Sequence, residues 1–104
     1  MVQSISPEHA SSLIATAHLD IVDVRDNSEW SSGHLPGARH VPLSRLRDKP
    51  LEELKRDGVL FVCAAGVRSE AAARLALSHG LANVYNLTGG TRGWARAGLP
   101  LVHD

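Results

Sequence analysis

The chain shows two kinds of hydrophobic pattern, one typical of strands and the other typical of helices. Short apolar runs bounded by polar residues predict strands, and the clearest are residues 2–5, 19–24, 58–62 and 83–87. Apolar residues three or four positions apart predict helices over 6–17, 44–56 and 69–79, the second interrupted around Pro50. Strands that alternate with helices indicate an α/β domain with a mostly parallel sheet.

Capping and turn residues mark the ends of several elements. Ser6 is the expected cap of the first helix, with Pro7 at its first position. Asp26 or Asn27 is expected to cap a short helix that runs through Trp30. Two further short elements are predicted, a brief strand at residues 41–43, weakened by Pro42, and a helix around Trp94.

Length and charge limit the possible functions. The 104 residues are 43% hydrophobic and 21% charged, which fits a single domain spanning 1–104. Eleven basic side chains offset eleven acidic ones, so we expect no nucleic-acid partner and no membrane partner. The first ten residues lack the pattern of a signal peptide, and no apolar run is long enough to span a bilayer. A cytoplasmic location is therefore expected.

The chain has one cysteine, Cys63, so no disulfide can form within it, which is compatible with a reducing compartment. Six histidines show no spacing that suggests a metal site beside this lone cysteine. We therefore predict neither a metal nor a cofactor.

Cys63 lies at the carboxyl end of the predicted strand 58–62, where ligands bind in parallel α/β sheets. Gly66 allows the following loop to turn sharply, so that successive amide N–H groups can converge into an anion-binding nest. The start of the next helix and Arg68 add positive potential. All three features would stabilise a thiolate.

Two alternatives compete with a nucleophilic cysteine. Cys63 could be a buried core residue, as free cysteines often are. The arrangement is also similar to that of cysteine phosphatases, but their loop between cysteine and arginine is one residue longer. Only four residues separate Cys63 from Arg68 here, and the smaller cradle suits a persulfide better than a phosphate monoester.

Three groups of residues, in order, resemble the signatures of the rhodanese family. The resemblance covers nearly the whole chain, and the matching residues are Asp23-Val24-Arg25, Glu29-Trp30 and Gly33-His34-Leu35-Pro36-Gly37-Ala38, then Cys63-x-x-Gly66-x-Arg68-Ser69, then Gly80, Asn83-Val84, Leu87, Gly89-Gly90, Trp94 and Gly98-Leu99-Pro100. It implies a rhodanese-like α/β fold, with a five-stranded, mostly parallel sheet flanked by helices on both faces.

The resemblance also implies sulfur transfer in two steps. A small-molecule donor such as thiosulfate would give its outer sulfur to Cys63, the catalytic nucleophile, and an acceptor would remove it from the persulfide. Cyanide is the usual assay acceptor, while a thiol or a protein cysteine could serve in the cell. The backbone N–H groups of the loop would hold the substrate, and this expected cradle comprises Ala64, Ala65, Gly66, Val67 and Arg68.

Several points stay open at this level. Arg68 is the loop's one charge, so a thiol persulfide or a protein donor competes with thiosulfate, and Arg68 itself could bind substrate or tie the loop to a carboxylate. A non-catalytic or regulatory rhodanese-like module, with Cys63 as a redox sensor or in a protein-docking domain, is the alternative function. Structural roles are expected for an internal ion-pair set of Asp23, Arg25 and Glu29, and for His34 as a hydrogen-bonding residue of its loop.

Overall fold

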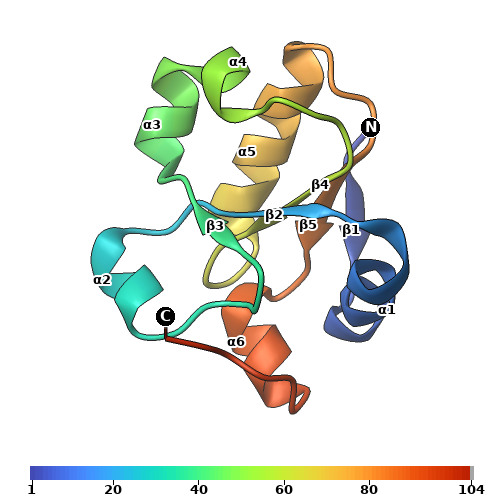
Figure 1. Ribbon diagram of the computed structural model, residues 1–104, viewed down its shortest axis with the longest axis vertical. Helices are drawn as coiled ribbons and strands as arrows, with labels where there is room; N and C mark the ends of the chain where they lie inside the picture. The colour runs from blue at the N-terminus through green and yellow to red at the C-terminus, as the bar shows by residue number, and fades with distance from the viewer. Residues whose placement is uncertain (104) are drawn as a thin grey trace.

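A computed structural model describes residues 1–103 and contains one five-stranded sheet in which every neighbouring pair of strands is parallel (Figure 1). Its spatial order is β1-β5-β4-β2-β3, so β4 lies at the centre. The strands are β1 (Gln3–Ile5), β2 (Asp20–Asp23), β3 (Arg39–His40), β4 (Val59–Val62) and β5 (Val84–Leu87). The predicted α/β class with a parallel sheet is confirmed.

Helices cover both faces of this sheet (Figure 1). They are α1 (Pro7–Ala17), α2 (Asn27–Ser31), α3 (Leu43–Asp48), α4 (Pro50–Glu53), α5 (Val67–Ser78) and α6 (Gly90–Arg96). Residues of α1 and α6 share one core with Leu60 and Val62, and residues of α3 and α5 share the other with Val59 and Phe61. All four residues of β4 are buried for this reason, which explains its unbroken apolar run.

The predicted elements differ from the structure at two informative places. The third strand is Arg39–His40, not 41–43, because Pro42 has no N–H to donate and α3 begins at Leu43. The helix predicted over 69–79 begins at Val67, since Gly66 adopts a left-handed conformation and forms its N-cap. Val67 and Arg68, expected in the loop, therefore form the first turn of α5.

The loop after β4 is held from the opposite face by the start of α6. Thr91 N–H donates to the carbonyl of Cys63 at 2.8 Å, and Arg92 N–H donates to that of Ala64 at 3.2 Å. Gly90 allows this approach, because a Cβ atom there would fall on the backbone of Cys63 and Ala64. The position of the cysteine is therefore fixed by packing between two elements far apart in sequence.

Replacing Gly90 with alanine should destabilise the protein strongly. The added Cβ overlaps backbone, and the φ of +60° already disfavours a side chain. We expect a loss of about 2–5 kcal/mol, from overpacking and backbone strain together. Gly98→Ala is the matched control, because Gly98 has a φ of +81° but nothing within 4 Å of the added Cβ. Urea unfolding of both variants measures the difference, and equal losses would show that the close approach contributes nothing.

Candidate active site

Cys63 directly follows the central strand, and its residue is only 1% exposed. A turn of three residues, Ala64, Ala65 and Gly66, separates it from α5. Gly66 has a φ of +102°, which L side chains rarely adopt, so the glycine is required for the chain to reverse this sharply. The thiol thus lies at the carboxyl end of the sheet, as the sequence predicts.

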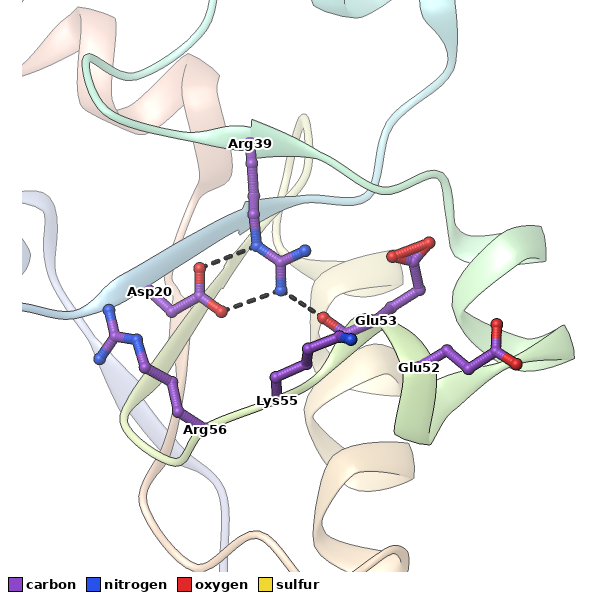
Figure 2. A pocket seen from close by; sticks show the side chains of 6 residues that line it. All are labelled: Asp20, Arg39, Glu52, Glu53, Lys55 and Arg56. Carbon is purple, nitrogen blue, oxygen red and sulfur yellow. Dashed lines mark hydrogen bonds and ion pairs between the residues drawn. The ribbon is translucent and has the colours of Figure 1, made fainter.

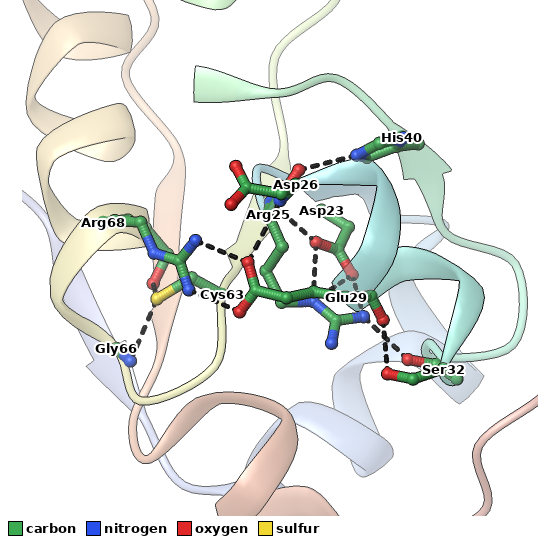
Figure 3. A network of polar contacts seen from close by, with 11 residues as sticks. Asp23, Arg25, Asp26, Glu29, Ser32, His40, Cys63, Gly66 and Arg68 are labelled. Atoms are coloured by element: carbon green, nitrogen blue, oxygen red, sulfur yellow. Dashed lines mark hydrogen bonds and ion pairs between the residues drawn. The ribbon is translucent and has the colours of Figure 1, made fainter. Parts of the chain in front are cut away.

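Two hydrogen-bonding groups meet the sulfur directly. Gly66 N–H donates to Cys63 Sγ at 3.0 Å (Figure 3). The Ser69 hydroxyl lies 3.2 Å from the same sulfur. Burial raises the pKa of Cys63, but its hydrogen bond with the Ser69 hydroxyl and those from the backbone N–H groups of Ser69, Ala65 and Gly66 lower the pKa by more. The pKa therefore lies below its ordinary value.

The serine is the residue that sequence reasoning missed as a functional group. In the sequence, Ser69 stands out only as the last position of the motif around Cys63, although a serine in the first turn of a helix is well placed to reach back to the preceding loop. Its side chain is fully buried and contacts Asn86 on β5 at 2.5 Å. Asn86 was not singled out at all, because one polar residue in a strand gives no signal of its own.

Arg68 forms a two-pronged ion pair with Glu29 on α2. Nη1 and Nη2 donate to the two carboxylate oxygens at 2.8 and 2.9 Å (Figure 3). The hydrogen bond from Arg68 lowers the pKa of Glu29 to about 2, against the opposing effect of burial. The other three N–H groups of the guanidinium have no hydrogen-bond partner among residues 1–103. Arg68 therefore ties α5 to α2 and still presents donors.

The expected ion-pair set of the first signature divides into two. Asp23 and Arg25 form a buried pair at 2.8 Å, and Arg25 Nη2 also donates to the carbonyl of Gly33 at 2.7 Å. Glu29 belongs to the Arg68 pair instead. The prediction is thus confirmed for Asp23 and Arg25, while Glu29 joins the rim of the cysteine loop.

His34 has the expected structural contacts. Its Nδ1 lies 3.0 Å from the carbonyl oxygen of Trp30, and the two rings stack with centroids 3.4 Å apart. Backbone hydrogen bonds in both directions join His34 to Val102, near the end of the described chain. These contacts fix the loop that follows α2.

A hollow lined by charged side chains lies at the other end of the sheet (Figure 2). Asp20 and Arg39 are the first residues of β2 and β3, so the hollow opens at the amino ends of the strands. Arg39 is held by both oxygens of Asp20 and by the Glu53 carbonyl (Figure 2). The arginine is therefore engaged in structural contacts, and this hollow is separate from the cysteine site.

Residues 1–103 contain no cluster of metal-binding side chains and no helix that could cross a membrane. Asp23, Glu29 and His34 are engaged in the ion pairs and loop contacts given above. The candidate site comprises one buried sulfur, its N–H donors and the rim arginine.

Comparison with known proteins gives a consistent result. The Rhodanese-like domain model matches residues 6–97. The chain is similar to "Sulfurtransferase" of Allochromatium vinosum, with 35% identity over 98% of this chain and 96% of the relative. It is also similar to "Thiosulfate sulfurtransferase GlpE" of Actinobacillus succinogenes, with 33% identity over 93% of this chain and 87% of that one. Two Bacillus subtilis relatives are longer, and the chain spans 41% and 59% of them.

Solved structures agree. A rhodanese-related protein from Thermoplasma volcanium superposes with a TM-score of 0.87 at 31% identity, covering 98% of this chain and 99% of that one. The chain therefore belongs to the rhodanese-like family.

The thiol of Cys63 should be more acidic than that of a free cysteine. Its hydrogen-bond donors favour the thiolate, so the rate of alkylation by iodoacetamide should rise with pH through an inflection below the roughly 8.5 of an unperturbed thiol. The single cysteine gives a single curve. The same curve in urea supplies the unfolded reference, and an inflection no lower in the folded protein would mean that burial dominates.

Arg68 can be tested for substrate binding separately from loop ordering. Arg68→Ala should cost less than about 1 kcal/mol of stability, as half-exposed ion pairs do. If its free N–H groups hold an anionic donor, kcat/KM for thiosulfate should fall about tenfold or more, and Arg68→Lys should not restore it, because an ammonium lacks the planar fork.

Arg74→Ala is the control for this series. Arg74 lies on the same helix and pairs with Glu70 in an exposed contact of 3.5 Å. It should change neither stability nor turnover appreciably. Unaltered turnover in Arg68→Ala would restrict Arg68 to ordering the loop.

Proposed function

We propose that this protein is a sulfurtransferase that carries sulfane sulfur as a persulfide on Cys63. The observation that carries the proposal is a lone, buried sulfur at the carboxyl end of the central strand, with an N–H donor 3.0 Å away. Its membership in the rhodanese-like family and relatives named as sulfurtransferases support the same reaction.

The reaction we propose proceeds by two displacements at sulfur. The Cys63 thiolate attacks the outer sulfur of thiosulfate, the S–S bond of the donor breaks, and sulfite leaves with the bonding electron pair. The new bond makes Cys63 a persulfide whose outer sulfur carries the negative charge. A nucleophilic acceptor such as cyanide then attacks that outer sulfur, and the thiolate leaves, ready for another donor.

The backbone around the loop supplies what these steps need. Thiolate and persulfide are both anions, and N–H groups fixed by the turn at Gly66 and by the start of α5 stabilise negative charge without reorganising. Ala64, Ala65, Gly66, Val67 and Arg68 are proposed as the cradle of the outer sulfur. The contact between α6 and the loop carbonyls keeps these groups in position.

Thiosulfate is the proposed donor because relatives such as the Actinobacillus succinogenes protein carry that name. A thiol persulfide or a protein donor competes with it, since Arg68 shares its charge with Glu29. For the acceptor, cyanide serves in assays, and a thiol or a protein cysteine is the proposed cellular acceptor. A cytoplasmic location stays a prediction from the sequence.

Cys63→Ser tests the proposal directly. A serine hydroxyl stays protonated and accepts sulfur poorly, so the variant should fold normally and transfer no sulfur from thiosulfate to cyanide. The wild-type protein, treated with thiosulfate alone, should gain the mass of one sulfur atom, and the variant should not.

Two results would count against this function. Full turnover by a folded Cys63→Ser protein would remove the nucleophile. Absence of the added sulfur in the wild type, with every donor class tried, would favour the redox-sensing or docking module instead.

A further inference from the structure

A closed chain of polar contacts lies behind the catalytic sulfur. Cys63 Sγ is 3.2 Å from the Ser69 hydroxyl, which is 2.5 Å from Asn86 Oδ1, and Asn86 Nδ2 donates to the carbonyl of Gly66 at 3.1 Å. Gly66 N–H returns to the sulfur at 3.0 Å. Ser69 and Asn86 are 0% and 5% exposed, so these groups must satisfy one another and not water.

The orientation of each group follows from counting protons. A carbonyl can only accept, so the Asn86 atom that faces Gly66 is the amide nitrogen. The amide oxygen therefore faces Ser69, and two oxygens 2.5 Å apart need a proton between them. Only the serine can supply it, and the serine has one.

This count leaves the serine with lone pairs facing the sulfur. A protonated Cys63 can donate its S–H to Ser69, and all contacts are then satisfied. Once the thiol proton leaves to a base in solvent, the serine lone pairs and the thiolate repel each other. The repulsion becomes an attraction only if the hydroxyl turns from Asn86 to Cys63, where it makes a charge-assisted bond.

We propose that the Ser69 hydroxyl is a two-position donor, turned to Asn86 when Cys63 is a thiol and to the sulfur when Cys63 is a thiolate. Asn86 is then a positioning residue that competes for the single serine proton. This inference rests on the proposed function only in giving the acidity of Cys63 a use in sulfur transfer. The acidity itself can be tested without any sulfur donor.

Charged groups lie on the elements around the loop, and Arg68 interacts electrostatically with Cys63, so the test must leave these groups in place. They are Arg68 on α5, Glu29 on α2, Asp23 and Arg25 around the end of β2, and Arg92 on α6. Substitutions at Ser69 and Asn86 change none of them, so a shift in thiol acidity reports the hydrogen-bonded chain.

Four proteins form the experiment: wild type, Ser69→Ala, Asn86→Val and the double variant, each with the pKa of Cys63 measured from iodoacetamide alkylation. Ser69→Ala should raise that pKa, because the thiolate loses a donor. Asn86→Val should lower it by about one unit, because the serine proton is released to the sulfur, a change of about 1.4 kcal/mol. In the Ser69→Ala background, Asn86→Val should shift it by no more than about 0.3 unit.

A merely structural Asn86, which only clamps Gly66, would shift the pKa equally in both backgrounds, and that result overturns the proposal. Thermal melts confirm folding, and Asn86→Ala replaces Asn86→Val if the latter does not fold.

A second measurement depends on Ser69→Ala alone. The single S–H stretching band of Cys63 at low pH should move to higher frequency in that variant, because the thiol loses its acceptor. An unmoved band overturns the proposal.

The outcomes are independent of sulfur transfer. Coupling between the two residues without any persulfide would contradict the proposed function and leave this inference standing. A persulfide without coupling would do the reverse.

Discussion

The physical constraint on which the rest of the site depends is that a buried thiol must be able to ionise. A cysteine that is 1% exposed loses the stabilisation that water gives a thiolate, so protein donors must replace water. The turn at Gly66 brings one such donor to 3.0 Å, and the first turn of α5 brings the Ser69 hydroxyl. Both depend on a loop that cannot relax, because α6 is hydrogen-bonded to its carbonyls from the other face.

The ion pairs around the loop have a different task. Asp23 and Arg25 are buried together, and Arg25 reaches the carbonyl of Gly33, so this pair orders the segment after β2. Glu29 and Arg68 join α2 to α5 at the rim. Because Arg68 holds the pKa of Glu29 down to about 2, the pair contributes its full stability above the ordinary carboxyl pKa of 4.5. This stability is lost as pH falls from 4.5 through about 2.

Much of this arrangement could be predicted from local signals. The apolar run of β4, the cysteine after it and the glycine that starts the next helix lie within a few residues, and periodicity and turn chemistry identify them. The pairing of Glu29 with Arg68 spans 39 positions and that of Ser69 with Asn86 spans 17. Such contacts depend on how α2 and β5 pack around the loop, so the periodicity of the sequence does not predict them. The start of β3 at Arg39 depends on long-range pairing as well, since Arg39 and His40 lie opposite Val22 and Asp23 of β2, whereas Pro42 limits its end.

The division between loop and rim bears on which donor the site accepts. The loop stabilises negative charge on sulfur through backbone groups, which serve any donor equally. Selection therefore falls to the rim, where Val67 is 78% exposed and Arg68 is already paired with a carboxylate. The remaining N–H groups of Arg68 can donate to a doubly charged inorganic donor, whereas the exposed Val67 can contact the organic part of a thiol persulfide, so the two donor classes would use different rim residues. Chemistry set by the backbone and specificity set by side chains can thus vary independently on this fold.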